Sequence, residues 1–244
     1  MTYQWQSAQE THRGNRRKNN EDSVLCRPEV PLFTVADGMG GHMAGDVASQ
    51  AITDALSRLP LGGPLSDDVD RVEDALLSVN DELRLHAQNE CRGGTVGSTV
   101  VTLIAREEVG VVLWAGDSRL YRLRHGRLEQ VTRDHNPVCD LLDSGAVTEQ
   151  EALAADTNII TRAVGGQAIL SMDVAVFDVD QGDTLLLCSD GLYREVHEDV
   201  LSEALAGDDL DAIADSLLCR CLAGTAKDNV SLVLARPESA VGAS

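Results

Sequence analysis

Aromatic side chains, cysteines and basic residues are all scarce in this 244-residue sequence. Phe, Trp and Tyr together make up 3% of the chain, so a core must be built from Val, Leu, Ile and Ala. Six cysteines are too few for a disulfide-stabilised scaffold of this length. Twenty Lys and Arg against forty Asp and Glu give a net charge of −20, which argues against nucleic acid or a membrane surface as the main partner.

Long apolar runs are also missing. The N-terminal residues contain no hydrophobic stretch of the kind found in secretory signals. No apolar run approaches the roughly 20 residues needed to cross a bilayer. Hydrophobic residues still make up 43% of the chain, which is ample for a packed core. We therefore expect a cytoplasmic globular protein that forms a single domain over residues 1–244.

The spacing of apolar residues predicts an α+β fold. Helical spacing occurs over residues 44–59, 69–83 and 210–221. Short segments rich in Val, Leu and Thr predict strands at 32–36, 99–105, 109–115, 120–124, 174–179, 184–188 and 230–235. The three strands between 99 and 124 have connections too short for a parallel crossover, so we expect antiparallel sheet with helices packed outside it.

Three segments lie outside these elements. Residues 60–64 are expected to join two helices. Residues 136–166 form a long polar insertion between predicted strands, and loops of this length are usually functional, so we interpret them as a flap. Residues 236–244 are expected to be a frayed tail.

Aspartates stand at the ends of four apolar runs. Asp37, Asp117 and Asp190 follow such runs, and Asp228 precedes one. A single Asp-Gly pair is usually only a turn, but four such positions could place several carboxylates at one end of the sheets. A hard divalent cation would relieve their repulsion, and all-oxygen ligation favours Mg²⁺ or Mn²⁺ over zinc.

Further charged residues could join this cluster. Glu21, Asp22 and Asp134 lie in polar segments. The densest positive cluster of the acidic chain consists of Arg13, Arg16, Arg17 and Lys18. It is either a solvated arm or, beside a cation site, a binding element for a phosphate ester.

Seven short motifs occur in order along the chain: Arg17-Lys-Asn-Asn-Glu21-Asp22, Ala36-Asp37-Gly38-Met-Gly-Gly41-His42, Gly97-Ser98-Thr99, Gly116-Asp117-Ser118-Arg119, Asp134-His135, Ser189-Asp190-Gly191 and Lys227-Asp228-Asn229. Together they resemble the metal-dependent protein phosphatases of the PPM or PP2C type, in their compact bacterial form. The resemblance extends over residues of about 10 to 235. It implies two antiparallel β-sheets packed face to face and flanked by helices, in four αββα layers.

The resemblance also implies a metal site. Asp37 would bridge two Mn²⁺ or Mg²⁺ ions, with the Gly38 carbonyl on one ion and Asp190 and Asp228 on the other. Glu21 and Asp22 would hold metal-bound waters, and Asp134 with Asp190 would suit a third, weaker ion. Asp117 resembles the structural aspartate of a tight turn in the family and is not counted as a ligand.

The implied chemistry is hydrolysis of a phosphate ester by water. Two cations roughly 3.5–4 Å apart lower the pKa of a bridging water, and Arg17 would bind the phosphate oxygens through two parallel hydrogen bonds. Some members of the family have a leaving-group histidine directly after the Asp-Gly pair, where this chain has Met39. His42 is not assigned that role, and a metal-bound water is implied instead.

Other functions fit parts of the sequence. Cys188-Ser-Asp-Gly191-Leu-Tyr-Arg194 matches the Cys-x-x-Gly-x-x-Arg loop of cysteine-dependent phosphatases, with a Cys188 thiolate as nucleophile. Against this, Leu187 and Glu195 replace the residues usual at the ends of that loop, and Cys188 can equally be a buried strand residue. A phosphoprotein-binding module on the same fold and a phosphatase of small metabolites are further alternatives.

We therefore predict a stand-alone cytoplasmic phosphoserine/phosphothreonine protein phosphatase that depends on Mn²⁺ or Mg²⁺. The resemblance implies phosphorylated proteins as substrates and a partner Ser/Thr kinase whose action is reversed. Nucleic acid and membranes are not expected as partners, and we expect a monomer. Bacterial type VI secretion is one of several settings in which short proteins of this family occur.

Overall fold

The computed structural model describes residues 3–40, 44–90, 94–148 and 159–239. One set of strands comprises β1 (Tyr3–His12), β7 (Arg119–Arg124), β8 (Arg127–Gln130), β10 (Thr184–Cys188) and β11 (Val230–Ser239). The other comprises β2 (Asp22–Arg27), β3 (Leu32–Gly40), β4 (Val96–Ser98), β5 (Val100–Arg106), β6 (Val109–Ala115) and β9 (Asp173–Asp178). The helices are α1 (Ala44–Ser57), α2 (Leu65–Glu90), α3 (Pro137–Asp143), α5 (Asp190–Tyr193), α6 (Glu198–Leu205) and α7 (Leu210–Ala223).

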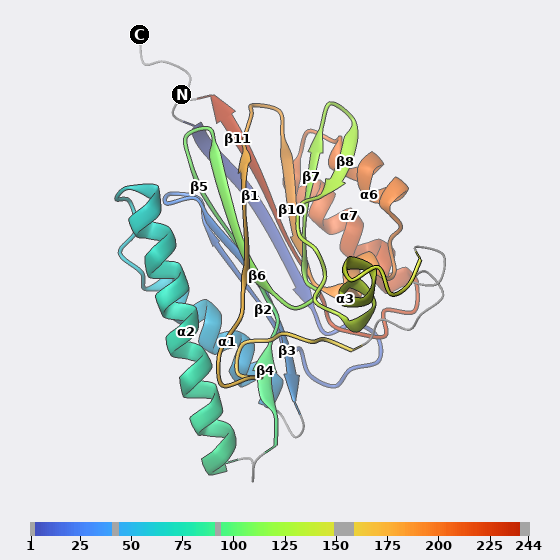
Figure 1. Ribbon diagram of the computed structural model, residues 1–244. Helices are drawn as coiled ribbons and strands as arrows, with labels where there is room; N and C mark the ends of the chain where they lie inside the picture. The colour runs from blue at the N-terminus through green and yellow to red at the C-terminus, as the bar shows by residue number, and fades with distance from the viewer. Residues whose placement is uncertain (1–2, 41–43, 91–93, 149–158, 240–244) are drawn as a thin grey trace.

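The strands form two antiparallel sheets. The order in the first sheet is β1-β11-β10-β7-β8, and the order in the second is β2-β3-β5-β6-β9, with β4 paired to β3. Helices α1 and α2 cover the outer face of the second sheet, and α6 and α7 cover that of the first (Figure 1). This is the four-layer α+β arrangement predicted from the sequence.

Both faces of the central strands are buried. In β3, Phe33 and Val35 face the first sheet, whereas Leu32 and Ala36 pack against the helices. Successive residues of a strand point to opposite faces, so a strand with two buried faces is apolar throughout and not alternating. The continuous apolar runs that identified these strands in the sequence follow from this double burial.

The predicted elements are found, and the structure extends or adds several. All seven predicted strands and three predicted helices are present within a few residues of their expected bounds, except that α2 extends to Leu65 and Glu90. Strands β1, β2, β4 and β8 were not predicted, because their polar residues hide the apolar pattern. β1, for example, buries only Trp5 and Ala8.

The expectation of a frayed tail over 236–244 is wrong for its first four residues. Arg236–Ser239 continue β11 and pair with Tyr3–Gln6 of β1. The main-chain ladder to β1 holds these polar residues in a strand, which side-chain hydropathy cannot reveal. Residues 240–244 lie outside the described part of the chain.

The predicted flap is anchored at both ends. Asn136 caps α3 by accepting a hydrogen bond from the Cys139 N–H at 2.8 Å. Near the other end, the Gly165 N–H donates to Asn80 Oδ1 of α2 at 2.8 Å, and Val164 forms a bridge with Ser98. Residues 149–158 of the flap lie outside the described ranges. No helix of the described residues is long and apolar enough to cross a membrane.

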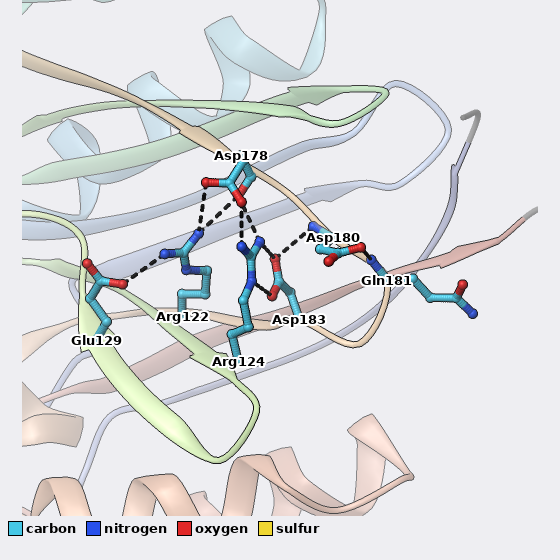
Figure 2. Close-up of polar contacts among 7 residues, drawn as sticks. All are labelled: Arg122, Arg124, Glu129, Asp178, Asp180, Gln181 and Asp183. Atoms are coloured by element: carbon cyan, nitrogen blue, oxygen red, sulfur yellow. Dashed lines mark hydrogen bonds and ion pairs between the residues drawn. The ribbon is translucent and has the colours of Figure 1, made fainter.

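A buried ion-pair network joins the two sheets at the start of β10 (Figure 2). Arg124 of β7 donates two hydrogen bonds to Asp183, at 2.6 and 2.7 Å, and also pairs with Asp178 of β9. The Asp183 side chain is fully buried. Arg122 extends the network to Asp178 and Glu129. A buried carboxylate is costly without its counter-charge, so the Arg124–Asp183 contact fixes β7 to the start of β10 within the first sheet. The ion pairs of Arg122 and Arg124 with the exposed Asp178 of β9 link that sheet to the second.

Replacing Asp183 by Asn is expected to lower the free energy of unfolding by about 3 kcal/mol, because Arg124 loses its charged, fully buried partner and keeps only the exposed Asp178 as a counter-charge. Urea unfolding of the two proteins measures the difference. The matched control is Asp54→Asn, which removes an exposed ion pair with Arg58 and should cost less than about 0.5 kcal/mol. Equal losses in the two variants would contradict a special role for the network.

Candidate active site

Loops at one end of both sheets meet in a cleft of about 360 Å³. Asp37 near the end of β3 and Asp228 before β11 reach it, as do Asp117 after β6 and Asp190 at the start of α5. The remaining lining residues are Arg17, Glu21, Gly38, Met39, Gly40, Ile160 and Arg194. The four aspartates that stand at strand ends in the sequence are therefore brought together in space.

The backbone of Asp37 is held by Thr99. The Asp37 N–H donates to Thr99 Oγ1 at 3.1 Å, and the Thr99 N–H donates to the Asp37 carbonyl at 2.9 Å. The Thr99 hydroxyl also lies 2.7 Å from that of Ser118, next to Asp117. Thr99 thus fixes two sides of the cleft relative to each other. Its motif was identified in the sequence, but this role was not.

Gly38 lies where no side chain would fit. A Cβ atom there would be 2.0 Å from the Gly45 carbonyl oxygen and 2.4 Å from that of Glu21. The Gly38 N–H donates to the Glu21 carbonyl at 3.0 Å, which places the half-buried Glu21 beside the first turn of α1. Burial raises the pKa of Glu21.

Asp22 is a buried carboxylate next to Asp37 across the β2–β3 ladder. Burial raises its pKa to about 7, although hydrogen bonds from Ser231 and Ser189 oppose the shift. Ser189 Oγ donates to Asp22 Oδ2 at 2.9 Å, whereas the buried Oδ1 makes no hydrogen bond within the described residues. This role of Ser189 could not be predicted from the sequence, because it depends on a contact between residues far apart in the chain.

The carboxylates around the cleft disfavour one another's ionisation. The pKa of Asp37 lies well above its usual range, because of burial and the neighbouring Asp22 and Asp190. The pKa of Asp190 is also raised by burial, and its buried Oδ1 makes no hydrogen bond with the described residues. Buried carboxylate oxygens without partners, beside other carboxylates, fit a hard divalent cation.

Two arginines supply the positive charge nearest to these groups. Arg17 Nη2 lies 2.7 Å from Asp228 Oδ2, and Arg194 Nε lies 3.0 Å from Asp190 Oδ2. Arg194 Nη2 lies 3.5 Å from Asp117 Oδ2. Within the described ranges, no three His, Cys, Asp or Glu side chains already converge tightly enough to hold an ion together. Ion binding would therefore require these side chains to rearrange away from the arginines.

Asp134 and Asp117 occupy different positions from those expected. Both oxygens of Asp134 accept hydrogen bonds from Arg119, at 2.9 and 2.8 Å, and Asp134 does not line the cleft. Asp117, which the sequence analysis set aside as a turn residue, does line it, and burial with the nearby Asp190 raises its pKa to about 6. Its place at the end of an apolar run predicted that it would join the other aspartates, although the resemblance to a turn aspartate kept it from being counted as a ligand.

The geometry excludes Cys188 as a nucleophile. Its side chain is fully buried in β10, and burial raises the pKa of the thiol. Arg194, the arginine of the alternative phosphate loop, pairs with Asp190 and Asp117 instead. The reading of Cys188 as a buried strand residue is confirmed. Met39 lines the cleft, and His42 lies outside the described residues.

Comparison with known proteins agrees with this site. The family model described as Protein phosphatase 2C matches residues 9–228. The chain belongs to the protein phosphatase 2C family. The resemblance seen in the seven motifs is thereby confirmed, and the prediction of a protein serine/threonine phosphatase agrees with the names of the relatives.

Three protein phosphatase 2C relatives illustrate the match. The serine/threonine protein phosphatase PstP of Mycobacterium tuberculosis is 36% identical over 230 residues, which are 93% of this chain and 44% of that protein. This chain thus spans less than half the length of that relative. A structure titled "PppA, a key regulatory component of T6SS in Pseudomonas aeruginosa" is 41% identical, with a TM-score of 0.88 over 97% of this chain and 99% of that one.

The third relative was solved with metal. The catalytic domain of PstP in complex with two manganese ions is 33% identical to this chain, with a TM-score of 0.83. The alignment covers 97% of this chain and 99% of that one. The protein phosphatase 2C fold of this chain is therefore shared with a structure that binds two ions.

The raised pKa of Asp22 makes the stability of the metal-free protein depend on pH. Asp22 is protonated in the folded state up to about pH 7, whereas in the unfolded state it ionises near its ordinary value of 3.8. Stability is therefore lost as pH rises. Between pH 5 and 8 in EDTA, wild type should lose roughly 2 kcal/mol more stability than Asp22→Asn. Urea unfolding tests this, and parallel pH profiles would contradict it.

Proposed function

We propose that this protein is a metal-dependent phosphatase that hydrolyses phosphoserine and phosphothreonine in proteins, with water as the nucleophile. The observation that carries the proposal is the single cleft in which four aspartates meet Arg17. Carboxylates suit the ions and a guanidinium suits the phosphate, so the cleft contains both halves of a phosphate-ester site. The names of the relatives support the same activity.

Two ions, Mn²⁺ or Mg²⁺, would be held by oxygen atoms of the cleft. We assign Asp37 to both ions, the Gly38 carbonyl to one, and Asp190 and Asp228 to the other, with Glu21 and Asp22 acting through waters. The unpartnered buried oxygens of Asp22 and Asp190 support this assignment. When bound, the ions supply Lewis-acid activation of water and orientation of the phosphate.

The chain's own residues position these groups. Thr99 fixes the Asp37 backbone, and Ser189 holds Asp22 in its buried site. The close approach of Gly38 to Glu21 and Gly45 brings β3 and α1 together at the cleft. These contacts hold the groups around the proposed ion ligands in place.

Arg17 is assigned to the phosphate. Its side chain is about half exposed, and its present partner is Asp228. Coordination of an ion by Asp228 would release the guanidinium, which could then donate two parallel hydrogen bonds to phosphate oxygens. Arg17 therefore serves as the counter-charge of Asp228 and would serve the substrate phosphate once Asp228 holds an ion.

For a third, weaker ion, the sequence-based assignment is Asp134 with Asp190. In that assignment the ion competes with Arg119 for both oxygens of Asp134. Asp117 offers a buried carboxylate already in the cleft. Comparing Asp134→Asn with Asp117→Asn in a Mn²⁺ titration distinguishes the two positions.

The biological setting is proposed from the relatives. We propose one phosphatase domain over residues 1–244, acting as a monomer in the cytoplasm and reversing a Ser/Thr kinase. The relative titled as a regulatory component of T6SS is 41% identical over nearly the whole chain, which makes type VI secretion the setting we favour.

Asp37→Asn and Asp190→Asn should each reduce Mn²⁺-dependent hydrolysis of para-nitrophenyl phosphate and of a phosphothreonine peptide by more than about 100-fold, because each removes an ion ligand. EDTA should abolish the activity of wild type. Circular dichroism should show an unchanged fold.

The controls are Asp54→Asn, an exposed helix residue, and Cys188→Ser, and both should retain activity. Near-wild-type rates of Asp37→Asn or Asp190→Asn would disprove the dinuclear site. Inactivity of wild type with Mn²⁺ would favour the phosphoprotein-binding module.

Arg17→Lys should lower kcat/KM for the phosphothreonine peptide about 10-fold, because an ammonium cannot reproduce the two parallel hydrogen bonds of the guanidinium. Steady-state kinetics with saturating Mn²⁺ measures the change. Arg127→Lys, at an exposed site in β8, is the matched control and should have no effect. Equal kcat/KM values for Arg17→Lys and wild type would remove Arg17 from the phosphate site.

A further inference from the structure

A second hollow of about 440 Å³ adjoins the cleft. It shares Asp190, Arg194 and Asp228 with the cleft and adds Glu195, Thr225 and Lys227. We call this hollow the annex. A peptide whose phosphorylated residue occupies the cleft would place a neighbouring side chain in or near it.

The wall of the annex is rigidly built. Glu195 accepts hydrogen bonds from both the N–H and the hydroxyl of Thr225. The next residue, Ala226, is fully buried and has a φ of +36°, a conformation that costs a residue with a side chain of the order of 1 kcal/mol or more. The loop is thus held in a strained form that presents Lys227 at the edge of the annex.

The same loop is fixed from the other side by the segment that carries Arg17. The Asn15 N–H donates to the Ala226 carbonyl at 2.8 Å, and Asn229 Nδ2 donates to the Asn19 carbonyl at 2.9 Å. Gly14 lies so close that a Cβ there would be 2.0 Å from the Asp228 carbonyl oxygen. The loop after β1 and the loop before β11 therefore form one unit (Figure 1).

This unit contains every lysine of the chain. Eighteen of the twenty basic residues are arginines, and the two lysines are Lys18 and Lys227. Both are exposed, and neither forms an ion pair with a described residue. Lys227 lines the annex, and Lys18 follows Arg17 in the same unit, so this unit carries two ammonium groups that can add attraction for anions.

We propose that the annex binds a second anionic group of the substrate, next to the phosphorylated residue, with Lys227 as the contact and Lys18 adding attraction. The group is the carboxylate of an Asp or Glu, or a second phosphate. The inference rests on the proposed function, in which ions neutralise Asp190 and Asp228. Glu195 keeps its negative charge in its hydrogen bonds with Thr225, but Arg194 and Lys227 then outnumber it, so the annex has a net positive charge. Lysine is a compact cation suited to either anion.

The test is the steady-state kinetics of three phosphothreonine peptides with Mn²⁺. One is neutral around the phosphothreonine, one has Glu at the flanking positions, and one has a second phosphothreonine there. Wild type should prefer the anionic peptides by about threefold to fivefold in kcat/KM, and the preference should fall with added salt. The second and third peptides show which anion is preferred.

Lys227→Gln should reduce this preference to near one, and Lys227→Arg should retain most of it. The matched control is Arg127→Gln, which removes an exposed charge from β8 and should leave the preference as in wild type. A wild-type preference of one, an unchanged preference in Lys227→Gln, or an equal loss in Arg127→Gln would overturn the proposal.

A binding measurement separates this inference from the proposed function. The same peptides, with a non-hydrolysable phosphonate in place of the phosphate, are titrated with Mn²⁺-loaded protein by fluorescence anisotropy. Tighter binding of the anionic peptides that depends on Lys227, without hydrolysis of the phosphate peptides, would support the annex and overturn the phosphatase. Hydrolysis with equal binding of all three peptides would support the phosphatase and overturn the annex.

Discussion

The rest of this structure depends on the repulsion among carboxylates at one end of a two-sheet sandwich. Asp37 and Asp22 belong to the second sheet, whereas Asp190 and Asp228 flank strands of the first. The packing of the sheets therefore brings like charges together. The pKa values of Asp22, Asp37 and Asp190 are raised first by burial and then by these neighbouring charges. Positive charge at this end is required by the fold itself, whether it comes from arginine or from divalent ions.

The arginines around the cleft acquire a double role from this requirement. Arg17 and Arg194 pair with Asp228 and Asp190, and both border the space where a phosphate would lie. The same arginines would therefore serve both the carboxylates and the phosphate, so metal binding and phosphate binding would be linked through shared partners.

Much of the fold and the centre of the site could be predicted from the sequence, because double burial makes central strands continuously apolar and the aspartates stand at their ends. The polar strands β1 and β2 could not be predicted, because they are held by main-chain hydrogen bonds to neighbouring strands and not by an apolar side-chain pattern. Sequence also could not predict the roles of Thr99 and Ser189 or the pairing of Asp134 with Arg119. Each of them depends on a contact between residues distant in sequence.

The ion-pair network of Arg124 and Asp183 lies at the start of β10, and Asp190 follows the end of the same strand. Arg122 and Arg124 also pair with Asp178 of the second sheet at this end, whereas the ion pairs at the cleft end involve carboxylates proposed to bind ions. We therefore expect local opening to start at the cleft side. Amide-hydrogen exchange near the cleft would then report the concentration of divalent ions, whereas amides near Arg124 would report only global unfolding.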